Sequence, residues 1–330
     1  MQRWNVDLNT TDWQTAPEAS EVSAALLNGE LVAIPTETVY GLAADATNGL
    51  ACAKIFEAKG RPQFNPLISH VPALSDAREH GDFGPMSLAL AEAFWPGPLT
   101  LVVPKKETSS ISDLATAGLQ TVALRVPEGP VMRFLSTKTG KPLAAPSANR
   151  SGKISPTRAQ DVVADLESSL SFIVDGGPCE VGIESTIVGL TDAVPRLLRP
   201  GGIGRESIES VLGTTLQAAP SEMRQDAPSA PGMLESHYAP DAKVILNAQE
   251  ASPSDALLSF GPDRLPGAES ANAEFNLSKN ADLKEAASRL FAGMRELDKS
   301  GANVIRVQFI PSFGLGEAIN DRLRRAAAPR

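Results

Sequence analysis

The sequence predicts an α/β or α+β protein with a mixed β-sheet, organised as two domains. Short apolar segments of strand length alternate irregularly with helical patterns, and several strand segments follow one another directly. The chain has 330 residues, long for one domain, and 42% of them are hydrophobic, enough for sizeable cores. Between residues 214 and 240 the composition changes to Ala, Pro, Ser and Gly with little apolar periodicity, which is typical of an interdomain linker.

These features divide the chain into four parts. We expect an N-terminal extension at residues 1–15, a larger domain at 16–213, a linker at 214–240 and a smaller α/β domain at 241–330. The N-terminus has no apolar signal segment, and no run of about 18 apolar residues occurs, so we expect neither secretion nor a membrane span. Cys52 and Cys179 are too few for a disulfide scaffold and indicate reduced thiols in a cytoplasmic protein.

Apolar spacing and turn residues place the elements in order. In the larger domain they predict helices at 17–28, 50–59, 86–94, 131–136 and 157–166, a helix that ends at Leu212, and strands at 31–35, 67–71, 99–104, 121–126 and 172–175. Gly29 and Gly60 are natural stops for the first two helices. In the smaller domain they predict strands at 244–246, 256–259 and 304–309, with amphipathic helices at 281–297 and 316–325.

The stretch KGRPQFNP, which begins at Lys59, is suited to holding an anion. Lys59 and Arg61 flank the helix stop, and Pro62 and Pro66 disfavour helical backbone in the residues before them. The guanidinium is therefore carried on stiff backbone. The alternative is a solvated helix end whose cations offset the C-terminal dipole.

Arg125 interrupts the strand predicted at 121–126. Thr121 and Ala123 share its face of the strand, and such small residues leave room for a ligand. An arginine at the edge or on the solvent face of a sheet is the alternative, and the sequence alone does not decide between them.

Two further polar segments are candidates for a site. In extended backbone, Thr36 and Thr38 lie on one face and Glu37 on the other, and Ser147 and Asn149 likewise share a face. Each pair offers hydroxyl or amide groups to one site. The alternatives are threonines selected for β propensity and an ordinary Ser/Asn turn.

Several functional classes lack support. No phosphate loop or three-glycine dinucleotide fingerprint occurs, so the larger domain is not a doubly wound nucleotide fold. The three histidines and two cysteines show no metal-ligand spacing, and no nucleophile elbow occurs. The formal net charge is −9, with 17 basic and 24 acidic residues up to Gly213 and 13 and 15 after it, so nucleic-acid binding would have to rest on a local patch.

Taken together, the motifs resemble a known family. They are PTETVYGL from Pro35, AKGRPQFNPLISHV from Ala58, WPGPLTLV from Trp95, ALRVP from Ala123, PSANRSGKISPT from Pro146, ESTIV from Glu184, RPGGIG from Arg199 and SHYAP from Ser236. In this order they resemble the YrdC-like domain and, with the second α/β domain, the long two-domain form of the threonylcarbamoyl-AMP synthase family, over about residues 15–330.

The resemblance implies a fold, a reaction and partners. The fold would be a twisted mixed sheet around a concave, positively lined cavity, with a smaller Rossmann-like domain. The reaction would join L-threonine, bicarbonate and ATP into threonylcarbamoyl-AMP, with release of pyrophosphate and water. A divalent ion such as Mg2+ would be held mainly by the ATP phosphates, without a protein metal site. The product would pass to the tRNA threonylcarbamoyltransferase machinery, and direct tRNA binding is not required.

The resemblance also assigns residues. It implies catalytic roles for Lys59, Arg61, Ser147 and Asn149. It implies ATP binding by Arg61, Asn65, Thr121, Ser147, Ser155, Arg199 and Tyr238, and threonine binding by Thr38, His70, Arg125, Ala145 and Ser185. Because Tyr238 lies in the linker, residues 231–240 would act as a lid that shields the carbamate and the adenylate from water.

Two other interpretations remain open. An RNA-binding or ribosome-associated module would show salt-sensitive RNA affinity without a need for ATP, and the acidic net charge disfavours it. YrdC-like domains also occur in carbamoyltransferases of hydrogenase maturation, but these carry acylphosphatase-like and zinc-finger segments that this sequence lacks.

Overall fold

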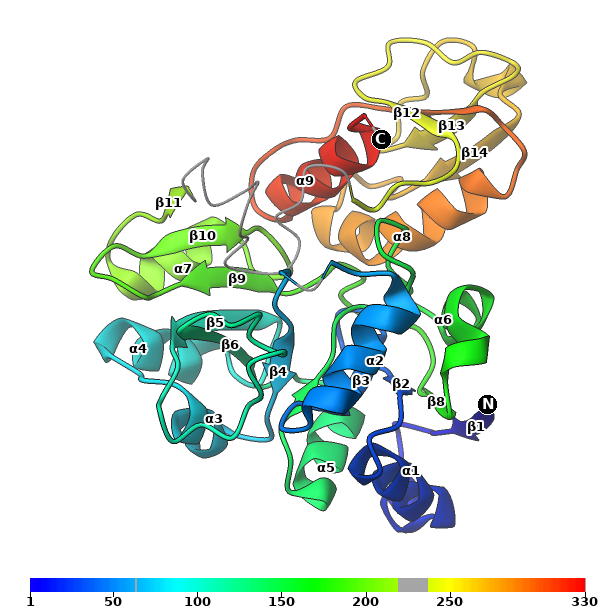
Figure 1. Ribbon diagram of the computed structural model, residues 1–330. Helices are drawn as coiled ribbons and strands as arrows, with labels where there is room; N and C mark the ends of the chain where they lie inside the picture. The colour runs from blue at the N-terminus through cyan, green and yellow to red at the C-terminus, as the bar shows by residue number, and fades with distance from the viewer. Residues whose placement is uncertain (63, 219–236, 330) are drawn as a thin grey trace.

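The structure is a computed structural model that describes residues 1–62, 64–218 and 237–329 (Figure 1). In these residues the larger domain is built on an 11-stranded mixed sheet with strand order β1-β8-β2-β3-β7-β4-β6-β5-β9-β10-β11. The strands are β1 (Gln2–Asn5), β2 (Val32–Ile34), β3 (Gly41–Asp45), β4 (Ile68–His70), β5 (Leu99–Pro104), β6 (Thr121–Arg125), β7 (Leu143–Ala144), β8 (Phe172–Asp175), β9 (Thr186–Gly189), β10 (Arg196–Arg199) and β11 (Gln217–Ala218). The mixed-sheet fold class predicted from the sequence is confirmed.

Helices cover both faces of one half of this sheet. They are α1 (Pro17–Leu27), α2 (Gly49–Lys59), α5 (Pro130–Thr139) and α6 (Ala159–Leu166). Ala33 of β2 packs in one cluster with Ile55 of α2, whereas its neighbour Ile34 packs in another with Val22 of α1 and Met132 of α5. Alternate side chains of a strand point to opposite faces, so α2 and α6 cover one face and α1 and α5 the other.

In the other half of the sheet, the helices described for the larger domain cover one face and leave the other open. On the covered face, Leu101 of β5 and Leu124 of β6 pack in the main core with α3 (Leu74–His80), α4 (Pro85–Phe94) and α7 (Arg205–Leu212). The opposite face carries a small cluster that includes Ile68, Val102 and Ala123. The residues two positions along from Ile68 and Ala123 are therefore directed to this second face.

The smaller domain has a parallel sheet. Its strands are β12 (Lys243–Ile245), β13 (Ala256–Ser259), β14 (Ala273–Asn276) and β15 (Val304–Val307), in the order β12-β15-β13-β14, with helices α8 (Leu283–Asp298) and α9 (Leu315–Ala327). In Figure 1, α8 and α9 lie between this sheet and the larger domain. The α/β character predicted for this part of the chain is confirmed.

The two domains share apolar packing. Val39, Ile154 and Ile183 of the larger domain belong to the same buried cluster as Phe291 of α8 and Ile319 of α9. Ion pairs join Arg205 to Glu317, Arg295 to Asp165 and Arg322 to Glu184 across the boundary. At Gly182 the φ angle is +71°, and a Cβ there would lie 2.4 Å from Cα of Ser288, so only glycine permits this close approach to α8.

The structure differs from the prediction at the N-terminus and at the start of the linker. Residues 2–5 are not an extension but form β1, which pairs in parallel with β8, and Trp4 is buried. Residues 217–218, placed in the linker by the sequence, form β11 and pair with β10. Both segments are edge strands, which need only one neighbour and little apolar character, so the sequence pattern gave no signal.

Candidate active site

A cavity lies on the face of the sheet that carries the cluster of Ile68, Val102 and Ala123. It holds about 460 Å³ of empty space, part of it open to solvent. Its walls are Thr38, Val39, Arg61, Ile68, His70, Arg125, Ala145, Pro146, Ser147, Glu184, Ser185, Arg199, His237 and Tyr238. Most of these residues come from strand ends and from the loops that follow them, where side chains can turn toward one point.

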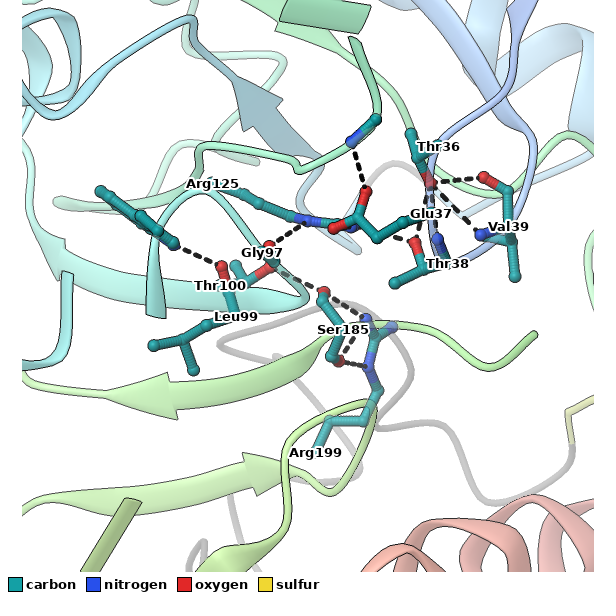
Figure 2. Close-up of polar contacts among 12 residues, drawn as sticks. Thr36, Glu37, Thr38, Val39, Gly97, Leu99, Thr100, Arg125, Ser185 and Arg199 are labelled. Carbon is teal, nitrogen blue, oxygen red and sulfur yellow. Dashed lines mark hydrogen bonds and ion pairs between the residues drawn. The ribbon is translucent and has the colours of Figure 1, made fainter. Parts of the chain in front are cut away.

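Arg125, at the end of β6, organises one end of the cavity. Its Nη2 donates to Glu37 Oε1 at 2.6 Å, its Nη1 to Thr38 Oγ1 at 3.0 Å, and its Nε to the carbonyl of Gly97 at 3.2 Å (Figure 2). Among the described residues these contacts use three of the five guanidinium N–H groups, so the other two can serve a carboxylate of a ligand. The interpretation of Arg125 as an edge residue facing solvent is wrong, because its side chain is buried.

Glu37 supports this arginine. Its second carboxylate oxygen accepts a hydrogen bond from the backbone N–H of Gly129 at 3.1 Å. Burial raises the pKa of the Glu37 carboxyl, but the Arg125 guanidinium together with the backbone N–H groups of Glu128 and Gly129 outweighs burial and holds the pKa below its usual value. Glu37 is therefore ionised at neutral pH and fixes the direction of Arg125.

The loop after β2 presents the hydroxyl of Thr38. Thr36 Oγ1 lies 2.8 Å from Thr38 Oγ1 and accepts from the N–H groups of Thr38 and Val39, so it closes a tight turn (Figure 2). The chain is thus not extended here, and Thr36 serves the loop while Thr38 reaches the cavity. The prediction that both hydroxyls face one site is therefore right for Thr38 and wrong for Thr36.

His70, at the end of β4, contributes a neutral imidazole. Its Nδ1 lies 3.3 Å from the carbonyl of Leu143, which fixes Nδ1 as the protonated nitrogen when the ring is neutral. Burial and the nearby Arg125 lower the pKa of His70 to about 3. His70 therefore offers polarity to a ligand without adding charge at pH 7.

Ser185 joins the two ends of the cavity. Its Oγ lies 2.8 Å from Thr100 Oγ1 and accepts from Nη2 of Arg199 at 3.2 Å (Figure 2). Arg199 also donates to the backbone carbonyl of Ser185 through Nε and Nη2. The serine hydroxyl is thus held between a strand threonine and a buried guanidinium.

Arg61 and Arg199 make the other end of the cavity cationic. Arg61 follows the C-terminal Gly60 of α2, which has a left-handed φ of 59° as the sequence predicts. Its guanidinium donates to the carbonyls of Asn65 and Pro66 at 3.2 and 3.0 Å. Burial and the proximity of Arg199 lower the pKa of Arg61 to about 10, so both arginines stay charged and favour an anion.

Lys59 lies behind the cavity wall and not in it. Its Nζ donates to the backbone carbonyls of Ser147 and Asn149, and Ser151 N–H donates to the carbonyl of Lys59 at 2.8 Å. Burial and the neighbouring Arg61 lower the pKa of Lys59. In this geometry Lys59 ties the end of α2 to the segment that carries Ser147.

Ser147 and Asn149 do not share a face. Ser147 lines the cavity, but the chain turns after it, and Asn149 Nδ2 donates to the carbonyls of Arg150 and Lys153 at 2.7 and 2.8 Å. The extended backbone assumed for this segment is therefore wrong. Asn149 Oδ1 is buried without a hydrogen-bond partner among the described residues.

Glu184 links the cavity to the smaller domain. Its Oε1 accepts from Ser155 Oγ at 2.5 Å, and its Oε2 accepts from Nε of Arg322, on α9, at 2.9 Å. Burial raises the pKa of Glu184, but Arg322 and Arg199 outweigh it and lower the pKa to about 2. Ser155 does not line the cavity, and it is connected to the site through its hydrogen bond to this carboxylate.

His237 and Tyr238 close the cavity from the linker side. The N–H of His237 donates to the carbonyl of Arg325 on α9 at 3.2 Å, and Ala239 N–H donates to the carbonyl of Gly152 at 2.8 Å. The ring of Tyr238 stacks on Phe291 at a centroid distance of 5.5 Å. Residues 231–236 of the predicted lid lie outside the described residues.

The structure brings together most of the residues assigned by resemblance. All five threonine-binding candidates line the cavity, namely Thr38, His70, Arg125, Ala145 and Ser185. So do the ATP-binding candidates Arg61, Ser147, Arg199 and Tyr238, whereas Asn65, Thr121 and Ser155 and the catalytic candidates Lys59 and Asn149 lie outside its wall.

The sequence interpretation missed the roles of Glu37, Glu184 and Arg322. The first two are inside quoted motifs, and an acidic residue beside a hydroxyl residue was the available signal. Arg322 is 138 positions from Glu184, and nothing local to it indicates a contact with the cavity.

Neither a metal centre nor a membrane helix is evident in the described part of the chain. Among residues 1–62, 64–218 and 237–329, no group of three or more His, Cys, Asp or Glu side chains could hold a metal ion. The helices described there are too short or too polar to cross a bilayer.

A mixed sheet with a buried, cationic cavity on its open face, followed by a parallel α/β domain, defines a YrdC-like protein with a second domain. Family comparison agrees: residues 24–201 match the family described as "Telomere recombination", and residues 203–328 match the C-terminal domain of threonylcarbamoyl-AMP synthase. The chain belongs to the threonylcarbamoyl-AMP synthase family.

Full-length relatives support this membership. The chain is 39% identical to threonylcarbamoyl-AMP synthase of Bacillus subtilis (strain 168), over 100% of this chain and 98% of the relative. It is 40% identical to the Pyrococcus abyssi enzyme of the same name, over 92% of each. The crystal structure of P. abyssi Sua5 complexed with L-threonine superimposes with a TM-score of 0.88 and 36% identity, over 99% of this chain and 98% of that one.

Proposed function

We propose that the chain synthesises L-threonylcarbamoyladenylate from L-threonine, bicarbonate and ATP, the first step of threonylcarbamoyladenosine formation in tRNA. One observation carries the proposal. A single cavity joins an end suited to a small amino acid, built around Arg125, to an end suited to phosphate, built around Arg61 and Arg199. The similarity to a relative solved with L-threonine supports the same assignment.

The chemistry follows from this arrangement. The amine of threonine and bicarbonate form a carbamate and water, and a carbamate oxygen then attacks the α-phosphorus of ATP as pyrophosphate leaves. Negative charge gathers in a small volume, where fixed cations stabilise it most strongly. Arg61 can hold phosphate oxygens through its planar fork, and Ser147 can donate a hydrogen bond without adding charge.

Arg125 would orient threonine. Its two remaining N–H groups can hold the substrate carboxylate, while Glu37 prevents the guanidinium from turning away. Thr38 and Ser185 line the same end and can bind the polar groups of the amino acid. No covalent nucleophile is required in this scheme.

The remaining assignments are also proposals. The reaction would make the chain a nucleotidyltransferase, and its product would pass to the tRNA threonylcarbamoyltransferase machinery. A divalent ion such as Mg2+ would be bound through the ATP phosphates, whose oxygens are ligands that this ion prefers. Cys52 and Cys179 form no disulfide, which is consistent with a cytoplasmic location.

The test is pyrophosphate release by the purified protein, with threonine and bicarbonate each omitted in turn. We expect release only when both are present. Arg61→Ala should abolish it, whereas Arg78→Ala, which removes an exposed arginine of α3, should not. Release that needs neither substrate, or none from folded protein, would contradict the proposal, and salt-sensitive tRNA binding without ATP would then favour the RNA-binding alternative.

A further inference from the structure

One arginine of the smaller domain is connected to the cavity without lining it. Arg322 lies on α9, and its side chain is 0% exposed. Its Nε donates to Glu184, its Nη1 donates to the carbonyl of Pro200 at 2.8 Å and to Asp321 at 2.9 Å, and its guanidinium carbon lies 5.2 Å from the ring centroid of Tyr238.

The contacts of Arg322 with Glu184, Pro200 and Tyr238 each involve a residue assigned to ATP binding or a direct neighbour of one. Glu184, held by Arg322, in turn holds Ser155. Pro200 directly follows Arg199 in the chain, and the Tyr238 ring is itself a wall of the cavity. In contrast, the hydrogen bonds and ion pairs that Arg322 makes with described residues do not reach Thr38, His70, Arg125, Ala145 or Ser185 directly, although Ser185 follows Glu184 in the chain.

Tyr238 needs such support because its backbone is strained. Its φ angle is +60°, a left-handed conformation that residues other than glycine seldom adopt. Strained conformations persist only where their surroundings determine them, and they gather at functional sites. Arg322 and Phe291 both contact this ring, and Asp321 accepts hydrogen bonds from both Arg322 and Arg325.

Stability alone does not account for Arg322. A buried ion pair is often no more stabilising than apolar residues of similar volume. In addition, Arg322 Nη2 is buried without a hydrogen-bond partner among the described residues, which is unfavourable. A gain in the placement of other groups explains why an arginine occupies this position.

We propose that Arg322 is a positioning residue through which the smaller domain holds the nucleotide half of the cavity in its binding geometry. The inference rests on the proposed use of ATP. It requires that a change at Arg322 affects ATP more than threonine, because its direct contacts include Glu184 and Tyr238 of the nucleotide end and none of the threonine-binding candidates.

The first experiment is a kinetic comparison of Arg322→Lys with Glu317→Gln. Lysine retains the charge next to Glu184 but loses the planar group over Tyr238 and the simultaneous contacts. We expect the KM for ATP to rise about tenfold or more, with the KM for threonine unchanged. Glu317→Gln is the matched control, because it weakens another ion pair between α9 and the larger domain without contacting Tyr238 or Glu184.

The second experiment observes Tyr238 directly and does not depend on activity. The chain has two tyrosines, Tyr40 and Tyr238, so 3-fluorotyrosine labelling gives two fluorine resonances, which Tyr40→Phe assigns. Arg322→Lys should shift or broaden the Tyr238 resonance and leave that of Tyr40 in place. Glu317→Gln should change neither.

Specific results would overturn the inference. One is a KM for ATP in Arg322→Lys that stays within about twofold of the wild-type value. The others are an equal rise in the KM for ATP in Glu317→Gln, and a rise in the KM for threonine as large as the rise in the KM for ATP. If Arg322→Lys does not fold, Asp321→Asn replaces it, with the same pattern and a smaller effect expected. If wild type shows no turnover, the proposed function fails, and ATP affinity by calorimetry then decides whether Arg322 positions the nucleotide end.

Discussion

Buried charge is concentrated around the cavity, and cations outnumber anions there. Arg61, Arg125 and Arg199 line it, whereas Glu37 and Glu184 are the buried carboxylates that face them. Both carboxyls keep lowered pKa values despite burial, so they are ionised and already paired with arginines. The remaining positive charge is what an anionic ligand would neutralise on binding.

At this scale the sequence predicts which residues contribute to the site better than which residues pair with one another. It places Arg125 beside small residues, which the structure confirms through the cluster of Ala123 and Ile68 next to the cavity. It cannot predict that Glu37 pairs with Arg125, because the assumption of an extended chain directs Glu37 to the opposite face, and the turn that Thr36 closes changes this.

His70 gives a prediction for stability against pH. Its pKa in the folded protein is about 3, below the ordinary value of 6.5, so only the unfolded chain binds a proton between these values. The unfolding free energy should therefore fall as the pH falls from 6 to 5, by about 1 kcal/mol for each histidine of this kind. His237 has the same pKa of about 3 and adds to the effect.

Urea denaturation at pH 6 and pH 5 measures this loss. His70→Asn, which can still donate to the carbonyl of Leu143, should reduce the difference between the two pH values. The control is the same comparison of wild type and His70→Asn at pH 8.5 and pH 7.5, where the imidazoles are neutral in both the folded and the unfolded chain, so the substitution should not change that difference. An unchanged difference between pH 6 and pH 5 in His70→Asn would contradict the neutral, buried imidazole.

At the scale of elements, long periodic segments were predicted well and short ones poorly. Helices α2 and α4 and strand β5 agree with the sequence pattern within a residue or so. Strand β3, with the sequence GLAAD, was missed because its small residues have low β propensity, and tertiary pairing with β2 and β7 overrides it. Helix α3 and strand β14 were also missed, since each is short and lacks a clear apolar period.

The junction of α2 with the Ser147 segment yields a prediction about Lys59. Lys59→Met keeps the length and apolar part of the side chain but leaves the carbonyls of Ser147 and Asn149 without their donor. We expect the unfolding free energy to fall by about 1–3 kcal/mol, together with a loss of activity as Ser147 shifts. Denaturation and pyrophosphate release, measured on the same samples, give both quantities.

Lys54→Met is the matched control, because Lys54 is on the same helix, is exposed and donates to the single carbonyl of Gly29. It should cost less stability and leave activity intact. If Lys59→Met loses activity with unchanged stability, Lys59 acts on the phosphates directly, and its role as a tie between two segments is wrong.

At the scale of the whole molecule, the contacts between the two domains could not be predicted from the sequence. Pairs such as Arg322 with Glu184 and Arg295 with Asp165 join residues more than 100 positions apart. No local pattern carries that information. The shared cluster of Ile183, Phe291 and Ile319 further shows that the two sheets are parts of one packed body.

From this shared packing we expect the two domains to assemble even when the chain between them is interrupted. Residues 1–218 and 237–330, produced as two separate polypeptides in one cell, should associate as the subunits of a heterodimer and co-purify through a tag on either one. Arg205→Glu together with Arg295→Glu, which reverses two of the ion pairs between them, should reduce this association. If either tagged polypeptide is purified from these cells folded and without its counterpart, this expectation is wrong. A stable heterodimer would allow the two halves to be exchanged between relatives.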